Sequence, residues 1–243
     1  MACRMLVAAG RFPWPSLLDG FKLMAQNENG NHEYRGRGHH VHGDGWGVMA
    51  RSSGAVRFYK NAVACWQDPV FNELYSITPD LVMLHARRAS PGTVVGHEFT
   101  HPFQDGDCYF CHNGTIYDFE GGARTDSQQF FDLILEHARQ CGDMMEAISR
   151  TVRDVKDYSA LNFILCSNDH VYVLNTYGRR GERTPHYYTM KYLSTEDYVV
   201  ISSERLPGPR QGWREMRNAS LLRLTLPDRQ VEICNMPGPP RRP

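Results

Sequence analysis

The chain begins Met1-Ala2-Cys3-Arg4-Met5-Leu6, where a cysteine leads directly into an apolar run that extends to Ala9. Residues 3–9 are predicted to form a short buried strand. Two interpretations of Cys3 are open on this stretch alone: a nucleophile that faces a pocket, or a small buried hydrophobic side chain. Taken by itself, the stretch favours the second. A nucleophilic cysteine also needs a base, because a free thiol with a pKa of about 8.5 is only partly ionised at neutral pH.

An α-amino group is a suitable base for such a thiol. Its pKa of about 7.7–8.0 lies close to neutral pH, where a general base is most effective. A cysteine that is itself the first residue could use its own amine in this way. Here Met1 and Ala2 precede Cys3, and removal of the methionine alone would leave Ala2 in place. A nucleophilic Cys3 therefore implies that a two-residue leader is removed.

The composition is that of an ordinary globular protein. Hydrophobic residues make up 41% of the 243 residues and charged residues 22%, enough for one large domain or two small ones. Lys plus Arg and Asp plus Glu balance at 27 each, so no nucleic-acid partner is expected. No apolar run approaches the roughly 20 residues of a membrane span, and no signal-peptide pattern is present. The seven scattered cysteines are interpreted as reduced thiols of a cytoplasmic protein.

Apolar periodicity predicts strands on either side of a pair of helices. Strands are predicted at residues 3–9, 45–50, 55–60, 81–85, 108–112, 161–166, 170–175, 198–202, 221–226 and 230–234. Residues 27–43 and 88–107 are predicted to be mostly loop. This order favours an α+β fold in which two sheets pack together with helices outside. We predict a single domain over residues 1–236 and a Pro-rich tail at residues 237–243.

Three helices are predicted from caps and apolar stripes. The first opens at Pro15-Ser16, with Ser16 and Asp19 spaced like a cap and its partner. Its apolar stripe consists of Leu17, Leu18, Phe21, Met24 and Ala25. The second follows Thr125 to Gln128, which have the T-x-x-Q spacing of a capping box. A third amphipathic helix is predicted at residues 143–156.

His97-Glu98-Phe99-Thr100-His101 matches H-E-x-x-H, a zinc-protease signature. That mechanism requires both histidines on one face of a continuous helix. Pro102 directly follows His101 and disfavours a helix there, and Gly92 and Gly96 stand upstream. Zinc binding is therefore not predicted, and a zinc hydrolase that uses these residues is a lesser alternative.

Two further motifs have plainer explanations. Cys108-Tyr109-Phe110-Cys111-His112 matches C-x-x-C-H, the attachment motif of c-type haem, but it is predicted as a strand in a chain without an export signal. His39, His40, His42 and Asp44 are interpreted as a solvated, histidine-rich loop rather than a metal site, since no partner stands at a recognisable ligand spacing. No metal or other cofactor is predicted.

Several short motifs follow one another along most of the chain, roughly residues 3–205. They are Cys3-Arg4-Met5-Leu6, His42-Gly43-Asp44-Gly45-Trp46-Gly47, His85-Ala86-Arg87-Arg88-Ala89-Ser90, Thr100-His101-Pro102-Phe103, His112-Asn113-Gly114, Thr125-Asp126-Ser127 and Ser202-Ser203-Glu204. Each is weakly specific alone, but together they resemble the class II glutamine amidotransferases, which are N-terminal nucleophile hydrolases. The resemblance points to the stand-alone branch, in which the amidase domain is the whole protein. It implies a four-layer αββα sandwich of two mostly antiparallel sheets flanked by helices.

The resemblance implies a catalytic role for three residues. Cys3 would be the nucleophile and would form a γ-glutamyl thioester. The side-chain amide of Asn113 and the backbone N–H of Gly114 would form the oxyanion hole, where losing one donor typically costs about 2.7–4 kcal/mol. A plain type I′ turn is the alternative for Asn113-Gly114, and the two interpretations are compatible. His101 is expected to be structural, because the base in this family is the amine.

Five further residues are implied to bind substrate or to shape the pocket. Arg87 matches the residue that grips the substrate's α-carboxylate with its guanidinium, and its alternative is a surface arginine at a strand end. Asp126 matches the residue that pairs with the α-ammonium, and its alternative is helix capping. Ser90 would line the pocket, and Trp46 and Gly47 would shape its wall close to the nucleophile.

The resemblance therefore implies an amidohydrolase that cleaves the γ-amide of glutamine or of a γ-glutamyl compound. It would release ammonia or an amine and leave glutamate, without a cofactor. The expected partners are a small-molecule substrate and, where ammonia is used, a separate synthetase subunit that accepts it. The alternative is a non-catalytic relative that retains Ala2 and binds γ-glutamyl ligands through Arg87 and Asp126.

Overall fold

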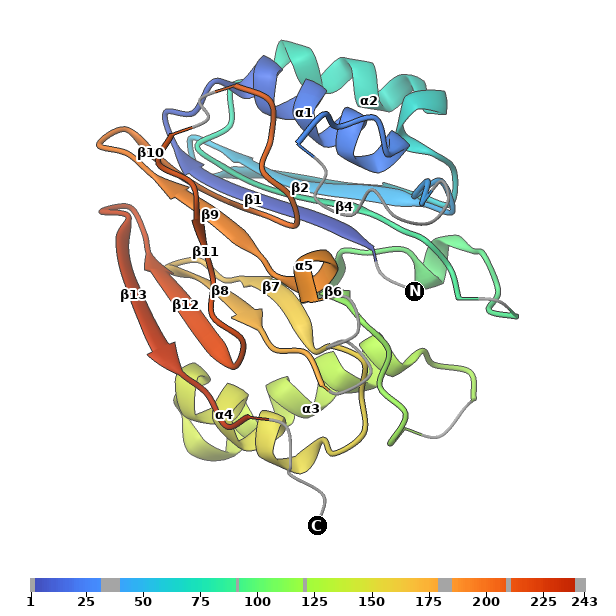
Figure 1. Ribbon diagram of the computed structural model, residues 1–243, viewed down its shortest axis with the longest axis vertical. Helices are drawn as coiled ribbons and strands as arrows, with labels where there is room; N and C mark the ends of the chain where they lie inside the picture. The colour runs from blue at the N-terminus through green and yellow to red at the C-terminus, as the bar shows by residue number, and fades with distance from the viewer. Residues whose placement is uncertain are drawn as a thin grey trace.

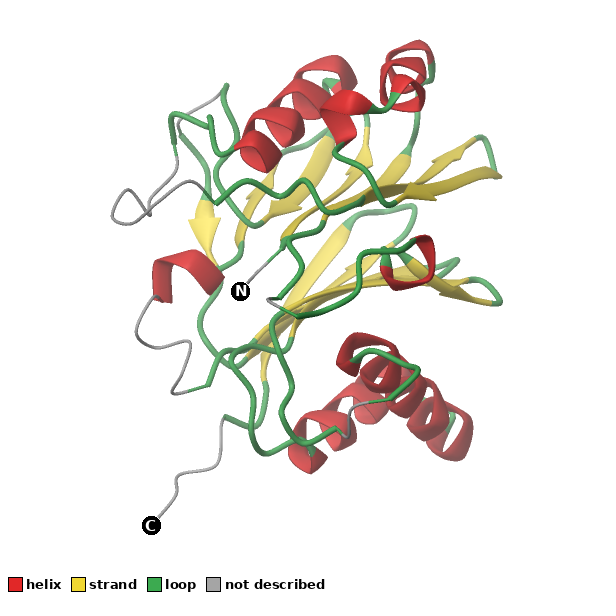
Figure 2. Ribbon diagram, turned by 90° about the vertical axis from the view of Figure 1, so that its right-hand side faces the viewer, coloured by secondary structure: helices red, strands yellow, loops and turns green. Residues whose placement is uncertain are grey.

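The computed structural model describes residues 3–31, 40–90, 92–119, 122–178, 185–208 and 211–238. In these residues two antiparallel sheets pack face to face, and helices cover the outer face of each sheet (Figures 1 and 2). The layers follow the order helices, sheet, sheet, helices, which is the predicted αββα sandwich. Met1 and Ala2, residues 32–39 of the predicted loop and residues 239–243 of the predicted tail lie outside the described residues.

The first sheet has the strand order β11-β9-β10-β1-β4-β2-β3 within the described residues. Its strands are β1 (Arg4–Gly10), β2 (Trp46–Ser52), β3 (Ala55–Asn61), β4 (Leu81–Ala86), β9 (Lys191–Ser194), β10 (Tyr198–Ser202) and β11 (Arg214–Glu215). β1 lies between β10 and β4 and is antiparallel to both. Leu6 and Ala8 face the helices, whereas Met5 and Val7 face the second sheet. The run is apolar throughout because both faces of this central strand are covered.

The second sheet has the order β13-β12-β8-β7-β6-β5 across the described ranges. Its strands are β5 (Phe103–Asp105), β6 (Cys108–Asn113), β7 (Asn162–Cys166), β8 (His170–Asn175), β12 (Ser220–Thr225) and β13 (Gln230–Asn235). Cys111, Ile164 and Val173 face the first sheet. Phe110 and Phe163 point the other way, into a second hydrophobic layer under the helices. Alternation along these strands therefore builds two cores, one on each face of the sheet.

Helices close both outer faces of the sandwich (Figure 2). They are α1 (Trp14–Gln26) and α2 (Pro69–Glu73) on the first sheet, α3 (Asp126–Cys141) and α4 (Met144–Asp154) on the second, and the short α5 (Pro185–Tyr188). The predicted apolar stripe of α1 is buried against the first sheet, as expected. None of the described helices has both the length and the apolar character that crossing a membrane requires.

The start of α1 differs from the prediction. The helix begins at Trp14 and has no side-chain cap. Ser16 therefore lies inside the first turn, and Asp19 accepts a hydrogen bond from the Tyr75 hydroxyl instead of completing a cap. Proline lacks an N–H and suits the first turn, so Pro15 lets the helix begin earlier without a polar cap.

α3 begins as predicted. The Thr125 hydroxyl accepts from the Gln128 backbone N–H at 3.2 Å, and the Gln128 side-chain oxygen accepts from the Thr125 N–H at 2.8 Å. These bonds form both halves of a capping box. Asp126 is therefore fixed as the first residue of the helix.

The structure contains some elements that were not predicted. The predicted loop at residues 88–107 contains a 3-10 turn (His97–Phe99) and β5. α2, β9 and β11 are also additional elements. Elsewhere the predicted strands coincide with observed ones to within a few residues, so the two-sheet core follows from the apolar runs.

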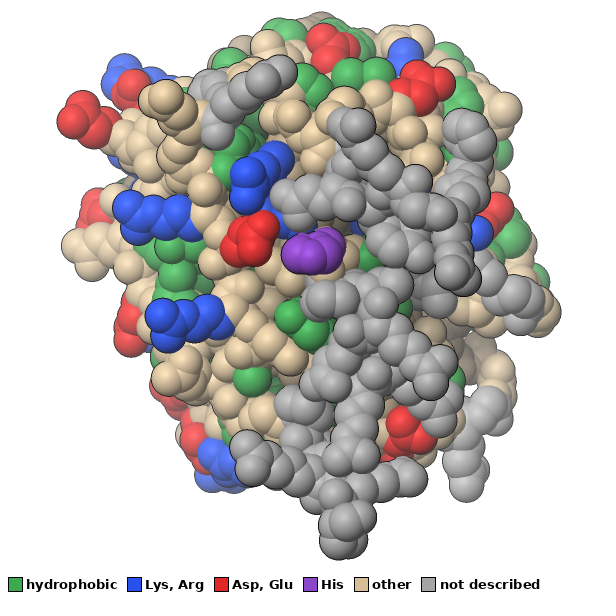
Figure 3. Space-filling view, in the orientation of Figure 1, with side chains coloured by type: hydrophobic (Ala, Val, Ile, Leu, Met, Phe, Trp, Pro, Cys, Tyr) green, Lys and Arg blue, Asp and Glu red, His purple; other side chains and the backbone are tan. Residues whose placement is uncertain are grey.

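Acidic and basic side chains lie interspersed on the face of the molecule in Figure 3. This pattern agrees with the formal balance of 27 acidic and 27 basic residues. A mixed surface of this kind does not attract a polyanion along one face.

Candidate active site

The ends of two strands from different sheets bring Cys3 and Asn113 together. Side chains alternate along a strand, so Cys3 shares the inner face of the first sheet with Met5. Asn113, the last residue of β6, shares the inner face of the second sheet with Cys111. The Cys3 backbone N–H donates to the Asn113 Oδ1 at 2.6 Å. The sequence placed these residues 110 positions apart, and the sandwich makes them neighbours.

A pocket of about 350 Å³ opens at this end of the sandwich. Five of the predicted site residues line it: Cys3, Arg87, Ser90, Gly114 and Asp126. They come from the start of β1, the segment after β4, the end of β6 and the start of α3. The pocket is thus built where strands end and the next segments begin.

Cys3 is a half-buried residue that lines the pocket. Burial raises the pKa of this thiol, while a hydrogen bond to the Arg88 backbone and the positive charges of Arg87 and Arg4 oppose that rise. The sulfur lies 4.0 Å from the Arg88 carbonyl oxygen. By comparison, burial in the apolar layer under α1 raises the pKa of Cys65 to about 12. Cys3 is therefore a thiol with cationic neighbours beside a cavity.

Asn113 ends β6 beside Cys3, and the next residue, Gly114, lines the pocket. Asn113 uses its Oδ1 to hold Cys3, and its buried Nδ2 has no hydrogen-bond partner among the described residues. Gly114 approaches the Ala160 backbone so closely that a Cβ would lie 1.9 Å from the Ala160 oxygen. Glycine is required here by this contact. An unpartnered buried donor costs roughly 1–3 kcal/mol, which a ligand oxygen would recover.

Asn113-Gly114 does not form the type I′ turn that was the alternative. That turn needs a positive φ at both central residues, and Asn113 is not among the residues with one. The chain instead leaves β6 and forms a bridge between Ile116 and Tyr158. The pair thus ends a strand at the pocket rather than reversing the chain.

Arg87 is buried, not a surface arginine. Its Nη2 donates to the Val94 carbonyl at 3.1 Å, and its Nη1 has no partner in the described ranges. Its backbone is clamped by Gly45 and Asp44: the Arg87 N–H donates to Gly45 O at 2.8 Å, and the Asp44 N–H donates to Arg87 O at 3.1 Å. The segment before β2 therefore fixes the backbone of Arg87, a residue that lines the pocket and has an unused side-chain donor.

Asp126 serves two purposes at the start of α3. Its Oδ2 accepts from the Ile116 N–H at 2.9 Å and its Oδ1 from the Ser127 N–H at 2.9 Å. The cap itself is supplied by Thr125, so Asp126 is not the capping residue. Asp126 also lines the pocket.

Trp46 does not shape the pocket wall, contrary to the prediction. Its side chain is fully buried under α1 and α2, and its Nε1 donates to Asp68 Oδ2 at 3.0 Å. Strand alternation causes this: Trp46 points to the helices and Gly47 to the space between the sheets. Gly47 lies against the His101 backbone, where a Cβ would be 2.2 Å from the carbonyl oxygen. Gly47 thus acts on the site indirectly, through His101.

Three buried histidines lie at the pocket or next to it: His85, His112 and His101, the last of which was expected to be structural. The rings of His85 and His101 have centroids 4.3 Å apart, and His101 and His112 both line the pocket. Burial lowers the pKa of His101 well below its usual value, with the positive charges of His85 and His112 as further causes. Neither ring nitrogen of His101 has a hydrogen-bond partner in the part of the chain that the structure describes. The pocket wall therefore holds a neutral imidazole with unused polar atoms.

In the described residues, the three motifs with plainer explanations show no grouping of metal ligands. His97–Phe99 is one 3-10 turn and Thr100 is extended, so no continuous helix carries His97 and His101. Cys108 and Cys111 lie in strand β6, as predicted. Among the described residues, which exclude His39, no group of three or more His, Cys, Asp or Glu side chains is arranged to hold a metal.

Comparison with known proteins gives the fold a family context. A family model described as glutamine amidotransferases class-II matches residues 30–200. An uncharacterized protein of Methanocaldococcus jannaschii is 23% identical, and the match covers 74% of this chain and 61% of that protein. The chain therefore spans less than two thirds of the length of this curated relative.

Two solved structures share the fold. Glutamine phosphoribosylpyrophosphate amidotransferase from B. subtilis, complexed with ADP and GMP, has a TM-score of 0.64 and 14% identity, and the match covers 96% of this chain and 49% of that one. A glutamine aminotransferase class-II domain protein from Silicibacter pomeroyi has a TM-score of 0.61 and 17% identity, covering 98% of this chain and all of that one. At such identities the likeness establishes the fold alone.

Proposed function

This chain belongs to the class-II glutamine amidotransferases, and on that premise we propose that it hydrolyses the γ-amide of glutamine or of a γ-glutamyl compound. The single observation that carries the proposal is the convergence of unlike groups on one pocket. A thiol, a guanidinium with a spare donor and a carboxylate line it together. A glutamyl end group carries an α-carboxylate, an α-ammonium and a γ-carbonyl, which need these three kinds of partner.

Binding would use the two charged residues that line the pocket with Cys3. Arg87 would grip the α-carboxylate with its Nη1, and Asp126 would pair with the α-ammonium. Ser90 lines the same wall and would contact this end. The γ-carbonyl carbon would then lie in front of the Cys3 sulfur, because the substrate is anchored at its other end.

Attack by the Cys3 thiolate would form a carbon–sulfur bond and place negative charge on the γ-oxygen. The Asn113 Nδ2 and the Gly114 N–H would stabilise that charge. Collapse of this intermediate breaks the carbon–nitrogen bond, and the amine leaves with a proton from the base. Water then hydrolyses the thioester, which yields glutamate and regenerates the thiol.

The base in this proposal is the amine of Cys3 itself. In the sequence that nitrogen is part of the Ala2–Cys3 peptide bond, so Met1 and Ala2 must be removed first. A freed amine would lie where the Cys3 nitrogen now donates to the Asn113 Oδ1. Its pKa of about 7.7–8.0 suits proton transfer near neutral pH.

The setting and the acceptor are part of the proposal. All seven cysteines are free thiols, which suits a reducing compartment such as the cytoplasm. The released ammonia would either be consumed by a separate synthetase or leave as a product. A small-molecule γ-glutamyl amide is the proposed substrate in both cases.

Ammonia release from glutamine, compared between wild type and Cys3→Ala, tests the reaction. We expect release by wild type and at least a thousandfold loss in the variant, as for other removed nucleophiles. Cys141→Ala, at the far end of α3, is the matched control and should equal wild type. Equal rates in wild type and Cys3→Ala would refute the proposed chemistry.

A second candidate, a non-catalytic γ-glutamyl-binding protein, rests on the two residues before Cys3. If Ala2 is retained, the cysteine nitrogen is an amide and the base is lost. The intact mass of the purified protein separates the two candidates. A mass without Met1 and Ala2 supports the enzyme, whereas a mass that retains Ala2 supports the binding protein.

A further inference from the structure

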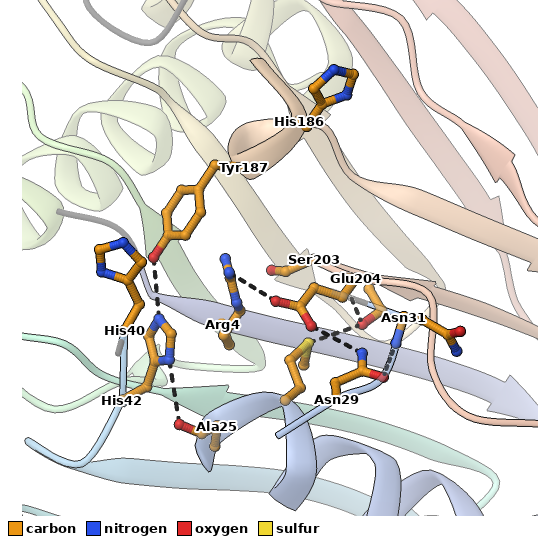
Figure 4. A network of polar contacts seen from close by, with 12 residues as sticks. Arg4, Ala25, Asn29, Asn31, His40, His42, His186, Tyr187, Ser203 and Glu204 are labelled. Carbon is orange, nitrogen blue, oxygen red and sulfur yellow. Dashed lines mark hydrogen bonds and ion pairs between the residues drawn. The ribbon is translucent and has the colours of Figure 1, made fainter. Parts of the chain in front are cut away.

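A buried ionic cluster surrounds Arg4 (Figure 4). Arg4, the next residue after Cys3, forms an ion pair with Glu204, with 2.8 Å between Nη2 and Oε1. The side chains are 1% and 7% exposed, so this pair is inside the protein. The proposed reaction gives these groups no role, and the sequence motifs contain both residues without explaining them.

Strand register accounts for the pairing. β1 and β10 are antiparallel and pair so that Leu6 lies opposite Ser202. Two residues before Leu6 and two after Ser202, the same register puts Arg4 opposite Glu204. Leu6 faces the helices, and so Arg4 faces them too, since residues two apart share a face. Cys3 therefore points into the pocket while its neighbour Arg4 points away from it.

Segments from distant parts of the chain hold this arginine. The Tyr187 ring lies 4.2 Å from the guanidinium carbon, in cation–π geometry. Glu204 also accepts from Asn29 Nδ2 at 2.9 Å, just beyond the end of α1. The Tyr187 hydroxyl lies 3.3 Å from His42 Nε2. Figure 4 shows these side chains converging on Arg4 from several elements.

The short helix α5, which contains Tyr187, also contacts the other side of the site. Tyr188, next to Tyr187 in α5, accepts a hydrogen bond through its backbone oxygen from Asn162 Nδ2 at 2.5 Å. Asn162 lies directly opposite Asn113 in the β6–β7 pair. α5 therefore contacts Arg4 on the first sheet and Asn162, the strand partner of Asn113, on the second.

Resting on the proposed function, we propose that Arg4 is the positioning residue for the nucleophile, clamped by Glu204 and Tyr187 so that Cys3 stays opposite Asn113 and Gly114. Adjacent residues on a strand move together, so fixing Arg4 on the outer face fixes Cys3 on the inner face. An ion pair is suited to this task because its geometry is directional, whereas an apolar contact tolerates sliding. Buried ion pairs are often no more stabilising than apolar pairs of similar size, so stability alone does not explain this one.

The double variant Arg4→Met/Glu204→Leu separates positioning from stability. Replacing both partners by apolar side chains avoids a lone buried charge and is expected to preserve the melting temperature. If Arg4 positions Cys3, kcat falls by about 100-fold, the usual effect of displacing a reacting group by roughly 1 Å. KM stays within about twofold of wild type, since Arg87 and Asp126 are untouched. A stable double variant with wild-type kcat would overturn the proposal.

Conservative variants keep the test decisive if the double variant does not fold. Arg4→Lys retains the charge but loses the planar fork, and we expect about a tenfold loss of kcat. Tyr187→Phe retains the ring over Arg4 and should keep most activity, whereas Tyr187→Leu should lose kcat. Wild-type kcat in both Arg4→Lys and Tyr187→Leu would also overturn the proposal. Arg223→Met/Glu232→Leu, a cross-strand pair at the surface, is the matched control and should equal wild type.

A readout that needs no amidase activity separates this proposal from the proposed function. The rate at which iodoacetamide alkylates Cys3, followed by mass spectrometry of its peptide, reports the environment of the thiol directly. Alkylation should change in the Arg4 and Tyr187→Leu variants and not in the surface control. If Cys3→Ala leaves ammonia release unchanged, the proposed function fails. If Cys3→Ala abolishes release but the Arg4 variants keep wild-type kcat and alkylation, only the positioning role fails.

Discussion

The space between the two sheets contains two regions that differ in polarity. In the middle, Met5, Ile164 and Val173 fill it with apolar side chains. At the open end, Arg87, His101 and Asn113 present buried nitrogen atoms that have no partner among the described residues. Each such atom costs the folded state roughly 1–3 kcal/mol. The apolar core therefore stabilises the sandwich, while the strand ends retain polar groups that can form hydrogen bonds with a ligand.

The largest effect is expected when a hydrogen-bond donor is removed from the polar end. Asn113→Ala deletes the unpartnered Nδ2 and the Oδ1 that holds the Cys3 nitrogen. We expect kcat for amide hydrolysis to fall by about 100- to 1000-fold, as for other oxyanion-hole donors. Steady-state kinetics with glutamine measure it. A variant that folds and keeps wild-type kcat would show that Asn113 is not part of the reaction.

Arg87→Met tests the proposed grip on the substrate's α-carboxylate. Loss of a charge-assisted hydrogen bond to a carboxylate costs about 1.5–3 kcal/mol, so KM should rise by roughly 10- to 100-fold. Arg87→Lys keeps the charge without the fork and should recover only part of the affinity. Kinetics or ligand titration of both variants are the measurement. An unchanged KM in Arg87→Met would show that Arg87 does not bind the substrate's α-carboxylate.

The buried histidines make the polar end sensitive to acid. Burial lowers the pKa of His85 to about 3, and the charge of Arg87 is the second cause. The unfolded chain, with a pKa of about 6.5, binds more protons, so this contribution is complete above about pH 6.5 and is lost as pH falls toward about 3. His85→Gln should therefore show a urea midpoint that changes less with pH than wild type. The exposed His97→Gln is the control, and equal pH dependence in wild type and His85→Gln would contradict this explanation.

The apolar region should respond to substitution in stability alone. Ile164→Val removes one methylene from the inter-sheet core and should cost about 0.5–1.5 kcal/mol of unfolding free energy. Urea denaturation measures the loss, and kcat of the folded protein should not change. A marked loss of kcat with little loss of stability would contradict the claim that the apolar region contributes to stability and not to catalysis.

The fold was predictable from the sequence because its core strands are strongly patterned. The run after Cys3 and the capping box at Thr125 and Gln128 fixed β1 and the start of α3. β9 and β11 were missed because they are short and begin with a lysine and an arginine, Lys191 and Arg214. Local patterns identify elements that are long and apolar, but strands as short as these form through tertiary pairing.

The site was predictable only in part. Motif order brought together Cys3, Arg87 and Asp126, which do line one pocket. Trp46 was misplaced because a motif does not reveal which face of a strand a residue takes. His101 was expected to be structural, but its place in the pocket wall beside His85 was not predictable, because burial depends on residues far apart in the chain.

The most direct measurement of the central claim is acid-quenched mass spectrometry of the enzyme mixed with glutamine. We expect a γ-glutamyl adduct on the peptide that contains Cys3, with Cys3 as its first residue. Ammonia release without an adduct on Cys3, or with an adduct on another residue, would contradict it.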